Sequence, residues 1–501
     1  MPLDRRRFLY VAAGAASAAL IADPLGQPAR AFAAAPSPLT ALDAIAQAQA
    51  IAKGEATAIE VLEAAIAQIE RLNPQLNAVV TTDFDRARDR ARDVKLQGPF
   101  AGVPYLLKDL TDVAGLRTTK GCRAMLTNIA TTTDKYAQAC IDAGLNVLGK
   151  SNTPEFGMSC TTESLALGPC YNPWNLKRSA GGSSGGAAAA VAVGMAPIAQ
   201  GSDSGGSIRI PASCCGVFGL KPSRGRLIGS TDVYGFGSRG VLSRSVRDTA
   251  HALAVTERSQ PAPGLKPVGL VSGPSKRRLT IGLYLKGENG AEPTAEVADA
   301  VLATARLCEE LGHDVKMSKI RFDVSVSDDY HVIGSRRSTE TIADLEKKLG
   351  RKVTLQDVEP PLLASAAHYR DGWDAKFDDA NRRVQQVSAD INEQMQQYDV
   401  VLSPVLRTAP PLTGEFSPFV PFDLLVERMI SYVAYTVVFN VTGMPAMSVP
   451  LAWNAQGLPI GSQFAARYGD ERTLLELAYQ LEEARPWADK WPPCTVVKQQ
   501  G

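Results

Sequence analysis

Two short segments of the chain are so rich in glycine and serine that neither can form a regular helix or strand. The first is Gly181-Gly182-Ser183-Ser184-Gly185-Gly186, and the second, Gly201–Arg209, carries Ser207 24 residues after Ser183. Glycine weakens helices and strands alike, because it loses the most backbone freedom on folding. Its value here is that backbone N–H groups can approach a ligand closely. The successive N–H groups of Ser204, Gly205, Gly206 and Ser207 predict a concave nest for an oxyanion, which places Ser207 to attack a carbonyl carbon. A glycine hinge, or an anion-binding loop without catalysis, stays open as an alternative.

A serine nucleophile needs a base that takes its proton. The chain has only 4 His, and none of them lies in a glycine- or aspartate-rich loop of the kind that holds a catalytic histidine. The candidate base is Lys108, which closes the apolar run Val103–Leu107. Taken alone, a lysine at such a position more often reaches out to solvent. If it is buried, desolvation disfavours the ammonium and brings its pKa from about 10.4 toward the range of about 7–8 that suits a base at neutral pH.

Two familiar motifs match the chain only formally. Gly144–Ser151 fits G-x-x-x-x-G-K-[ST], but its inner residues favour a strand, and Pro154 follows where a phosphate-binding loop would open a helix. Gly181–Gly185 fits G-x-S-x-G, but the residues before it, 172–180, are typical of a loop, and a nucleophile elbow needs an apolar strand there. We therefore expect neither nucleotide binding nor an α/β-hydrolase elbow.

The first 33 residues predict an export signal. Arg5-Arg6-Arg7-Phe8-Leu9 precedes the weakly apolar stretch Tyr10–Ala22 and the small-x-small site Ala31-Phe32-Ala33. The order resembles a twin-arginine signal, although Asp4 stands where Ser or Thr is more common. We expect residues 34–501 to be the mature protein, periplasmic or secreted. No later run approaches the roughly 18 apolar residues of a transmembrane helix, so we expect no membrane contact after cleavage.

Charge and cysteine usage narrow the partners further. Lys plus Arg is 53 and Asp plus Glu is 52, so the chain lacks the basic excess of a nucleic-acid-binding protein. We therefore expect no nucleic-acid partner.

The 8 Cys include no C-x-x-C pair, which argues against a zinc ribbon or a thioredoxin-like motif. Because the twin-arginine route carries proteins that have already folded in a reducing compartment, we expect mostly buried free thiols.

Local patterns predict helices first and then a sheet. Leu39–Lys53 predicts a helix followed by Gly54, Thr57 and Glu60 predict a capping box, and Asn73-Pro74 predicts the end of the next helix. From residue 100 to 227, short apolar runs alternate with glycine- and serine-rich loops, which is typical of an α/β sheet. Further along, the patterns predict a strand at Thr280–Tyr284, a helix at Ala295–Leu311, a strand at Val315–Ile320, a helix at Asp374–Gln397 and a strand at Val400–Leu402. Length alone suggests about three domains.

Several motifs in one order show that the chain resembles the amidase signature family, over nearly the whole mature chain. They are Leu107-Lys108-Asp109, Gly149–Phe156, Asn172–Asn175, Gly181–Gly186, Gly205–Ala212, Cys215–Pro222, Phe439–Ala446 and Gly457–Gly461. The resemblance implies a single α/β/α domain with a large twisted mixed β-sheet flanked by helices, at residues 34–501. It implies neither a metal nor an organic cofactor.

The resemblance also implies a Ser-Ser-Lys triad that hydrolyses amides through a seryl acyl-enzyme. Ser207 matches the nucleophile, Ser183 the bridging serine, which in the family follows a cis peptide bond, and Lys108 the base. Ser204, Gly205 and Gly206 match the oxyanion nest, and Ser159 is expected to line the acyl pocket. Asp203 and Arg209 are expected to brace the nucleophile loop, and Ser184 to be a hydrogen-bonding loop residue.

Within the family, Phe100–Leu110 and Asn172–Leu176 look most like the branch named 6-aminohexanoate cyclic dimer hydrolases. The partner expected from this resemblance is a small-molecule amide, linear or cyclic, such as a 6-aminohexanoate oligomer. A catalytically silent binding member of the fold, and an esterase or carbamate hydrolase, stay open as alternatives. The physiological amide and the oligomeric state, including a homodimer, are also left open.

Overall fold

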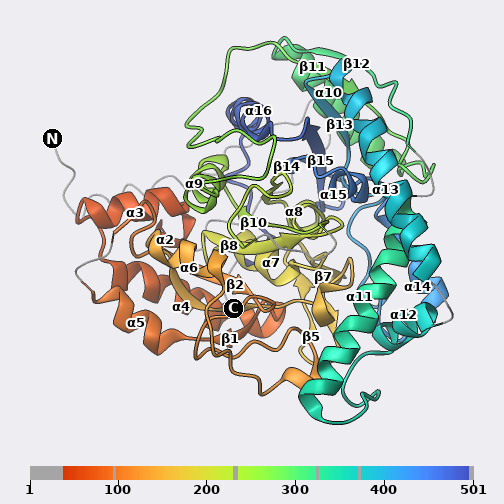
Figure 1. Cartoon of the computed structure of the whole chain (residues 1–501). Coiled ribbons are helices and arrows are strands. Elements are labelled where there is room, and N and C mark those ends of the chain that lie inside the picture. The colour runs from red at the N-terminus through yellow and green to blue at the C-terminus, as the bar shows by residue number, and fades with distance from the viewer. Residues whose placement is uncertain (1–37, 94–96, 230–234, 323–325, 371–373, 496–501) are drawn as a thin grey trace.

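A mixed β-sheet runs through the whole molecule in the computed structural model, which describes residues 38–93, 97–229, 235–322, 326–370 and 374–495 (Figure 1). Within these residues the main sheet has eleven strands. In spatial order they are β1 (Val79–Thr82), β3 (Asn146–Ser151), β2 (Pro104–Lys108), β8 (Ile198–Asp203), β10 (Ser238–Ser243), β9 (Phe218–Lys221), β14 (Ala446–Trp453), β15 (Pro459–Ala466), β13 (Val400–Pro404), β11 (Thr280–Leu283) and β12 (Asp314–Met317). The predicted export signal, residues 1–33, and the start of the expected domain lie outside the described residues.

Parallel and antiparallel pairs form separate blocks along this sheet. Strands β3, β2 and β8 run parallel to one another, as do β13, β11 and β12, whereas the strands between these groups pair antiparallel. Two small antiparallel pairs, β4 (Glu163–Ser164) with β5 (Gly168–Pro169) and β6 (Tyr171–Asn172) with β7 (Asn175–Ser179), stand apart from it. The large mixed sheet that the family resemblance implied is confirmed.

Alternating side chains of the strands feed two separate hydrophobic cores, one on each face of the sheet. In β2, Leu106 belongs to one core, while Tyr105 and Leu107 belong to the other. Successive side chains of a strand point to opposite faces, so a strand covered on both faces reads as continuously apolar. That is why Val103–Leu107 shows no polar alternation. The molecule is therefore built of three layers, helices on either side of the sheet.

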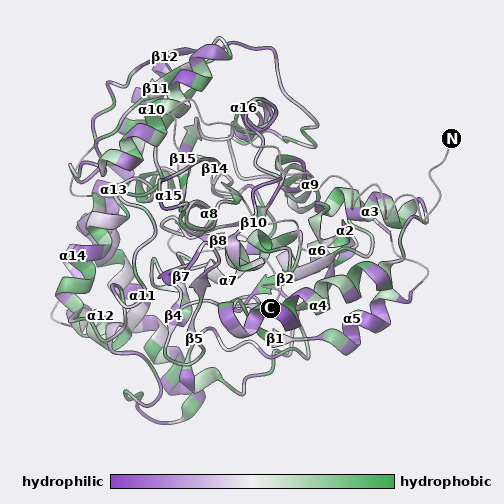
Figure 2. Ribbon diagram, turned by 180° about the vertical axis from the view of Figure 1, so that it is seen from behind, coloured by the Kyte–Doolittle hydropathy of each residue, from purple (hydrophilic) through white to green (hydrophobic). Residues whose placement is uncertain are grey.

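Helices from both halves of the chain cover the two faces. Figure 2 shows the outer ones, such as α4 and α10, with both hydrophilic and hydrophobic stretches, as expected of helices with one buried face. The helices are α2 (Pro38–Ala41), α3 (Ala44–Ala52), α4 (Ala58–Leu76), α5 (Phe84–Ala91), α6 (Lys135–Asp142), α7 (Gly185–Ala192), α8 (Arg209–Cys215), α9 (Val246–Thr256), α10 (Ala295–Glu310), α11 (Val326–Leu349), α12 (Pro360–Arg370), α13 (Asp374–Gln394), α14 (Phe422–Tyr432), α15 (Val437–Val441) and α16 (Glu471–Ala484).

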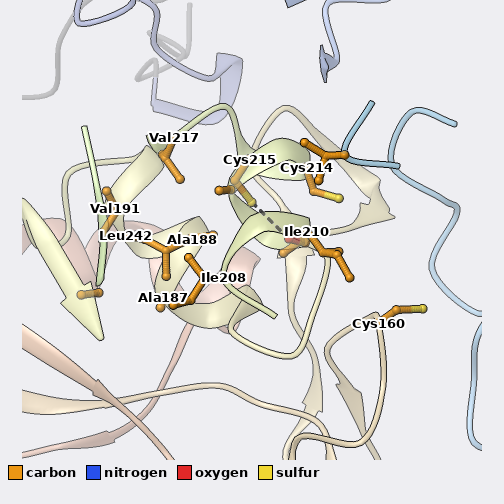
Figure 3. Close-up of a cluster of buried hydrophobic side chains, with 14 of the residues drawn as sticks. Cys160, Ala187, Ala188, Val191, Ile208, Ile210, Cys214, Cys215, Val217 and Leu242 are labelled. Carbon is orange, nitrogen blue, oxygen red and sulfur yellow. Dashed lines mark hydrogen bonds between the residues drawn. The ribbon is translucent and has the colours of Figure 1, made fainter. Parts of the chain in front are cut away.

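The expectation that the two glycine- and serine-rich segments contain no regular element is wrong in part, because Gly185 and Gly186 open α7 and Gly201–Asp203 end β8. The helices that start within or directly after these segments, α7 and α8, are buried on all sides. Every residue of α7 and of α8 is buried. Figure 3 shows Ala187 and Ala188 of α7 beside Ile208, within the same hydrophobic cluster as Val191 and Leu242. Small alanines let α7 lie close to the sheet, so the loops that precede α7 and α8 are held by a rigid core.

Most local predictions hold, and two helix predictions are wrong in their bounds. The capping box is present, with Thr57 and Glu60 bonded to each other's backbone, and the predicted strands and α10 form close to their expected bounds. Leu39–Lys53 is not one helix, because Asp43 caps a new helix by accepting from the Ala46 N–H. Asn73-Pro74 does not end α4: the helix loses one bond at Pro74 but continues to Leu76, and Asn77 ends it in the left-handed region.

Four further findings concern motifs and composition. Gly144–Ser151 includes β3 and is therefore a strand and not a phosphate-binding loop. The residues before Gly181 are predicted to be loop but form the short strand β7. That strand is polar, partly exposed and outside the main sheet, so it is not the apolar strand that a nucleophile elbow needs. All eight cysteines are free thiols. In the part of the chain that the structure describes, no helix combines the length and the apolarity needed to cross a bilayer.

Candidate active site

The candidate site lies where β2 and β8 end side by side. Because these strands run parallel, their carboxyl ends meet at one edge of the sheet. Lys108 is the last residue of β2, and Ser202 and Asp203 are the last residues of β8. The carboxyl edge of a parallel sheet is the usual place for a site in α/β proteins.

Lys108 is fully buried, so the surface interpretation of this residue is wrong. Its Nζ donates to Ser183 Oγ at 2.6 Å and to Ser202 Oγ at 3.0 Å. Burial lowers the pKa of Lys108 to about 7; the Asp203 carboxylate opposes this change, and the Arg337 guanidinium adds to it. A large fraction of Lys108 is therefore neutral near pH 7, when its nitrogen has a lone pair that can accept a proton.

The loop that carries Ser183 is held tightly against neighbouring segments. The peptide bond Gly182–Ser183 is cis, and Ser183 is 2% exposed. A Cβ placed on Gly182 would lie 2.5 Å from the Thr161 carbonyl oxygen, so only glycine fits there. Ser184 accepts a hydrogen bond from the Ser202 N–H at 3.3 Å, which joins this loop to the end of β8 and confirms its expected role.

Asp203 organises the loop that carries Ser207. Its carboxylate accepts from Arg209 Nε and from a second Arg209 nitrogen, each at 2.9 Å, and from Asn440 Nδ2 at 2.9 Å. Although burial alone would raise the pKa of Asp203, Arg209 and its other donors hold the pKa well below its usual range. Both partners of this ion pair are fully buried. The expectation that Asp203 and Arg209 brace this loop is confirmed.

Arg209 extends the brace to the C-terminal third of the chain. One guanidinium nitrogen donates to the Thr436 carbonyl at 2.9 Å and to Gln463 Oε1 at 2.8 Å, and another donates to Asn440 Oδ1 at 2.7 Å. The planar fork of arginine suits such multidentate binding. The loop that carries Ser207 is thus fixed by residues more than two hundred positions away in the sequence.

One of the expected nest donors faces away from the cavity. The Gly206 N–H donates to Asp203 Oδ1 at 2.7 Å, while Thr436 Oγ1 donates to the Gly205 carbonyl at 2.6 Å. These two groups belong to the same peptide unit, whose N–H and C=O point in opposite directions. The expectation that the Gly206 N–H binds an oxyanion is therefore corrected: Asp203 holds it within the loop. The other three nest residues, Ser204, Gly205 and Ser207, line the cavity described next.

A cavity of about 1020 Å³ opens beside these residues. Ser183, Ser207 and Ser159 all line it, so the structure brings Ser159 to the same space as the two serines. Lys108 does not line the cavity and touches it only through its hydroxyl partners. The walls of the cavity are mostly apolar and come from the core and from α11, α12 and α14. These three helices lie together at one side of the sheet (Figure 1). A volume of this size accommodates a ligand of many heavy atoms.

Two buried acids join the helices of the cavity wall to the core. Glu359, just before α12, donates its backbone N–H to Glu155 Oε2 at 2.9 Å. Burial, with the neighbouring Glu359, raises the pKa of Glu155 to about 8, and burial raises that of Glu359 to about 7. Among the described residues, no group of three or more His, Cys, Asp or Glu side chains is arranged to hold a metal ion.

Sequence reasoning missed the residues that α11 contributes. Tyr330 lines the cavity, its ring lies 5.6 Å from that of Phe236, and a Cβ placed on Gly205 would lie 2.7 Å from its hydroxyl. His331 also lines the cavity, and burial lowers its pKa. No local motif marks these residues. The signal available in the sequence was the recurrence of polar and small residues at helical spacing. Such a pattern indicates a helix that packs against another part of the protein.

Comparisons with known proteins agree on one family. The family model described as Amidase matches residues 60–475. The protein called "Putative amidase AmiC" from Mycobacterium bovis is 39% identical over 453 residues, which is 89% of this chain and 95% of that one. The 6-aminohexanoate-cyclic-dimer hydrolase of Paenarthrobacter ureafaciens is 37% identical over 478 residues, which is 90% of this chain and 96% of that one.

Solved structures of related proteins have the same fold as this chain. A structure of 6-aminohexanoate cyclic dimer hydrolase superposes with a TM-score of 0.86 at 34% identity, covering 91% of this chain and 99% of that chain. A second structure of this name, complexed with substrate, gives a TM-score of 0.84 at 34% identity and covers 91% of this chain and 100% of that one.

Proposed function

This chain belongs to the amidase signature family and is a C–N hydrolase of that family, and we propose that it cleaves carboxylic amides through a seryl acyl-enzyme with Ser207, Ser183 and Lys108. The observation that carries the proposal is the buried Lys108, whose Nζ lies 2.6 Å from Ser183 Oγ and whose pKa is about 7. A lysine placed so has the proton affinity that a base needs at neutral pH.

In the proposed first step, Ser207 Oγ bonds to the amide carbon. Its proton passes to Ser183 Oγ, while the Ser183 proton passes to neutral Lys108. Two O–H bonds therefore break, one new O–H bond forms on Ser183, and one N–H bond forms on Lys108, which becomes an ammonium. The carbonyl π electrons move to the oxygen, which the N–H groups of the Ser204–Ser207 loop, without that of Gly206, stabilise. Removing one such donor typically costs about 10²–10³ in rate.

The second step breaks the C–N bond. The electron pair of that bond goes to nitrogen, and the ammonium of Lys108 returns its proton through Ser183 to the leaving amine. Water then attacks the acyl-enzyme by the same relay, which yields the carboxylic acid and restores Ser207. Ser183 is needed because it stands between Lys108 and the cavity, which Lys108 itself does not line.

We also propose that the substrate is a linear or cyclic amide such as a 6-aminohexanoate oligomer. The support is the identity of 37% with a hydrolase named for the 6-aminohexanoate cyclic dimer and the largely apolar cavity of about 1020 Å³, which has room for a ring with two amide groups.

The experiment is a panel assay of released amine or ammonia with the purified protein. The panel holds short aliphatic amides, aryl anilides, an aryl carbamate and the 6-aminohexanoate cyclic dimer. Ser207→Ala is the blank, and Thr436→Ser, which keeps the hydroxyl that binds the Gly205 carbonyl, is the matched control. We expect turnover of at least one amide that vanishes in Ser207→Ala. A folded wild-type protein that hydrolyses no member, or equal turnover in Ser207→Ala, contradicts the proposal.

We further propose that residues 1–33 direct export by the twin-arginine route to the periplasm or beyond. The support is the Arg5-Arg6-Arg7-Phe8-Leu9 sequence followed by an apolar stretch and the Ala31-Phe32-Ala33 site. Replacing Arg5, Arg6 and Arg7 by lysine is expected to leave the protein in the cytoplasm and uncleaved, as seen by cell fractionation and mass spectrometry. Unchanged export by that variant would refute this route.

A further inference from the structure

One face of α11 forms a wall of the cavity. Most residues of α11 between Asp328 and Ser338 line the cavity, and Tyr330, Ile333, Gly334, Arg337 and Ser338 are among them. They are spaced as i, i+3, i+4, i+7 and i+8, which places them on one side of a helix. Gly334 is therefore in the centre of that wall, well inside a helix that runs from Val326 to Leu349.

Gly334 has no steric reason to be glycine. It lies in a regular helix, outside the backbone region that favours glycine, and a Cβ added to it would meet no atom within 4 Å. Glycine is the poorest helix former after proline, so this position weakens α11. Because Gly334 lines the cavity, the empty space in front of it belongs to the cavity.

Close packing between helices does not account for this glycine. The contact of α11 with α12 is made by other residues. Serines bond across it, with Ser338 Oγ 2.9 Å from Ser365 Oγ, and Ile342 and Leu345 of α11 share a hydrophobic cluster with Leu362 and Ala366 of α12. If α12 needed Gly334 for its approach, a Cβ there would meet atoms of α12, and it meets none.

The opening lies a short distance from the proposed nucleophile. Tyr330 is one turn before Gly334, about 6 Å along the helix axis at 1.5 Å per residue. The hydroxyl of Tyr330 reaches the loop that ends at Ser207, because it would lie 2.7 Å from a Cβ placed on Gly205. The space at Gly334 therefore suits a part of the substrate several bonds away from the scissile carbonyl.

We propose that Gly334 is a specificity-determining residue, and that the space it leaves holds the bulky apolar group of an amide substrate, a ring or a long chain, which extends away from the scissile bond. The inference rests on the proposed amide hydrolysis. The apolar character follows from the lining of the cavity, to which α14 contributes Leu425 and Met429. Short amides do not reach this space and gain nothing from it.

The test compares Gly334→Ala and Gly334→Leu with the wild-type full-length protein. Two substrate series are used: primary amides from acetamide to decanamide, and acetamides substituted on nitrogen from methyl to decyl and benzyl. Ala343→Leu is the matched control, because Ala343 lies on the same helix but is exposed and does not line the cavity. Thermal stability is recorded for every variant.

We expect Gly334→Leu to lower kcat/KM for the long members of one series by at least about tenfold, mainly through KM, since even one methylene in an apolar pocket is worth about tenfold or more. Acetamide turnover should change by less than about twofold, Gly334→Ala should be intermediate, and Ala343→Leu should have no effect. Gly334→Ala should not lower the melting temperature, because alanine forms helices better than glycine.

Three results would overturn the inference: an equal loss for short and long amides, no loss for any amide, or a drop in the melting temperature of Gly334→Ala. A wild-type protein without amide turnover would refute the proposed function instead. In that case the subsite is still tested by the effect of decanamide on the melting temperature of two variants, Ser207→Ala and the double variant Ser207→Ala with Gly334→Leu. We expect decanamide to raise the melting temperature of the first variant and not that of the second. No such stabilisation with Gly334 would overturn the inference independently of turnover.

Discussion

Replacing Lys108 by methionine is expected to stabilise the protein at neutral pH, by an amount that shrinks as the pH rises. Lys108 is fully buried and has a pKa of about 7 in the folded protein, against 10.5 in an unperturbed lysine. Between these two values the unfolded chain binds more protons than the folded one. The free energy of unfolding of the wild type therefore rises with pH throughout this window.

The size of the effect follows from the two pKa values. At pH 7 the lysine is almost fully protonated in the unfolded chain and half protonated in the folded protein. At about 1.4 kcal/mol per pH unit, this difference lowers the free energy of unfolding by about 4 kcal/mol, which is the cost of burying the lysine. At pH 9 the cost falls to about 2 kcal/mol, and above pH 10.5 it vanishes. Methionine has no such cost and is close to lysine in length.

The loss of hydrogen bonds to Ser183 and Ser202 opposes the gain, but by an amount that does not depend on pH. The assay is therefore the difference in melting temperature between variant and wild type at pH 7 and pH 9, with the exposed Lys177→Met as control. For a chain of this length we expect about 1 °C per kcal/mol, so the difference should change by about 2 °C. A difference that stays constant, or that grows with pH, would refute the burial argument.

Three shorter predictions follow from the same site. The kcat/KM of amide hydrolysis should rise with pH and level off above an apparent pKa of about 7, because neutral Lys108 is the active form; a flat profile from pH 5 to 9 would contradict its role as base. Asp203→Asn should destabilise the protein by about 3–5 kcal/mol, because it leaves buried Arg209 without a counter-charge; a melting temperature within about 1 °C of the wild type would count against this. Gly205→Ala should lose activity through collision with the Tyr330 hydroxyl, and Tyr330→Phe should restore part of it; no recovery in the double variant would show that the collision is not the cause.

Much of the site was predictable because its chemistry depends on short-range sequence. Gly182 and Gly206 must be glycine for steric reasons that leave a clear signature, namely glycine and serine where no helix or strand tolerates them. The strand β2 was predictable because burial on both faces leaves a continuous apolar run. The ion pair of Asp203 and Arg209 that braces the Ser207 loop was predictable, because two opposite charges lie six residues apart on either side of that loop.

The remaining features depend on contacts between distant segments, which local patterns do not encode. Whether Lys108 is buried depends on β8 and on the Ser183 loop, which cover it. The direction of the Gly206 N–H is decided by Asp203 on one side and Thr436 on the other, and the latter is 230 residues away. The cavity face of α11 is defined only by what α11 packs against, so Tyr330 and Gly334 carry no motif.

The brace around Arg209 has a consequence for biosynthesis. All three proposed catalytic residues are synthesised in the first half of the chain, but Arg209 is anchored by Thr436, Asn440 and Gln463. While the ribosome is still translating the second half, the nucleophile loop therefore lacks the partners that give it shape. Activity should appear only after the segment through Gln463 has emerged, so a nascent or truncated chain carries every reactive group and remains inert. Hydrolysis by this protein would thus report that the chain has been translated at least through Gln463 and that this part has folded.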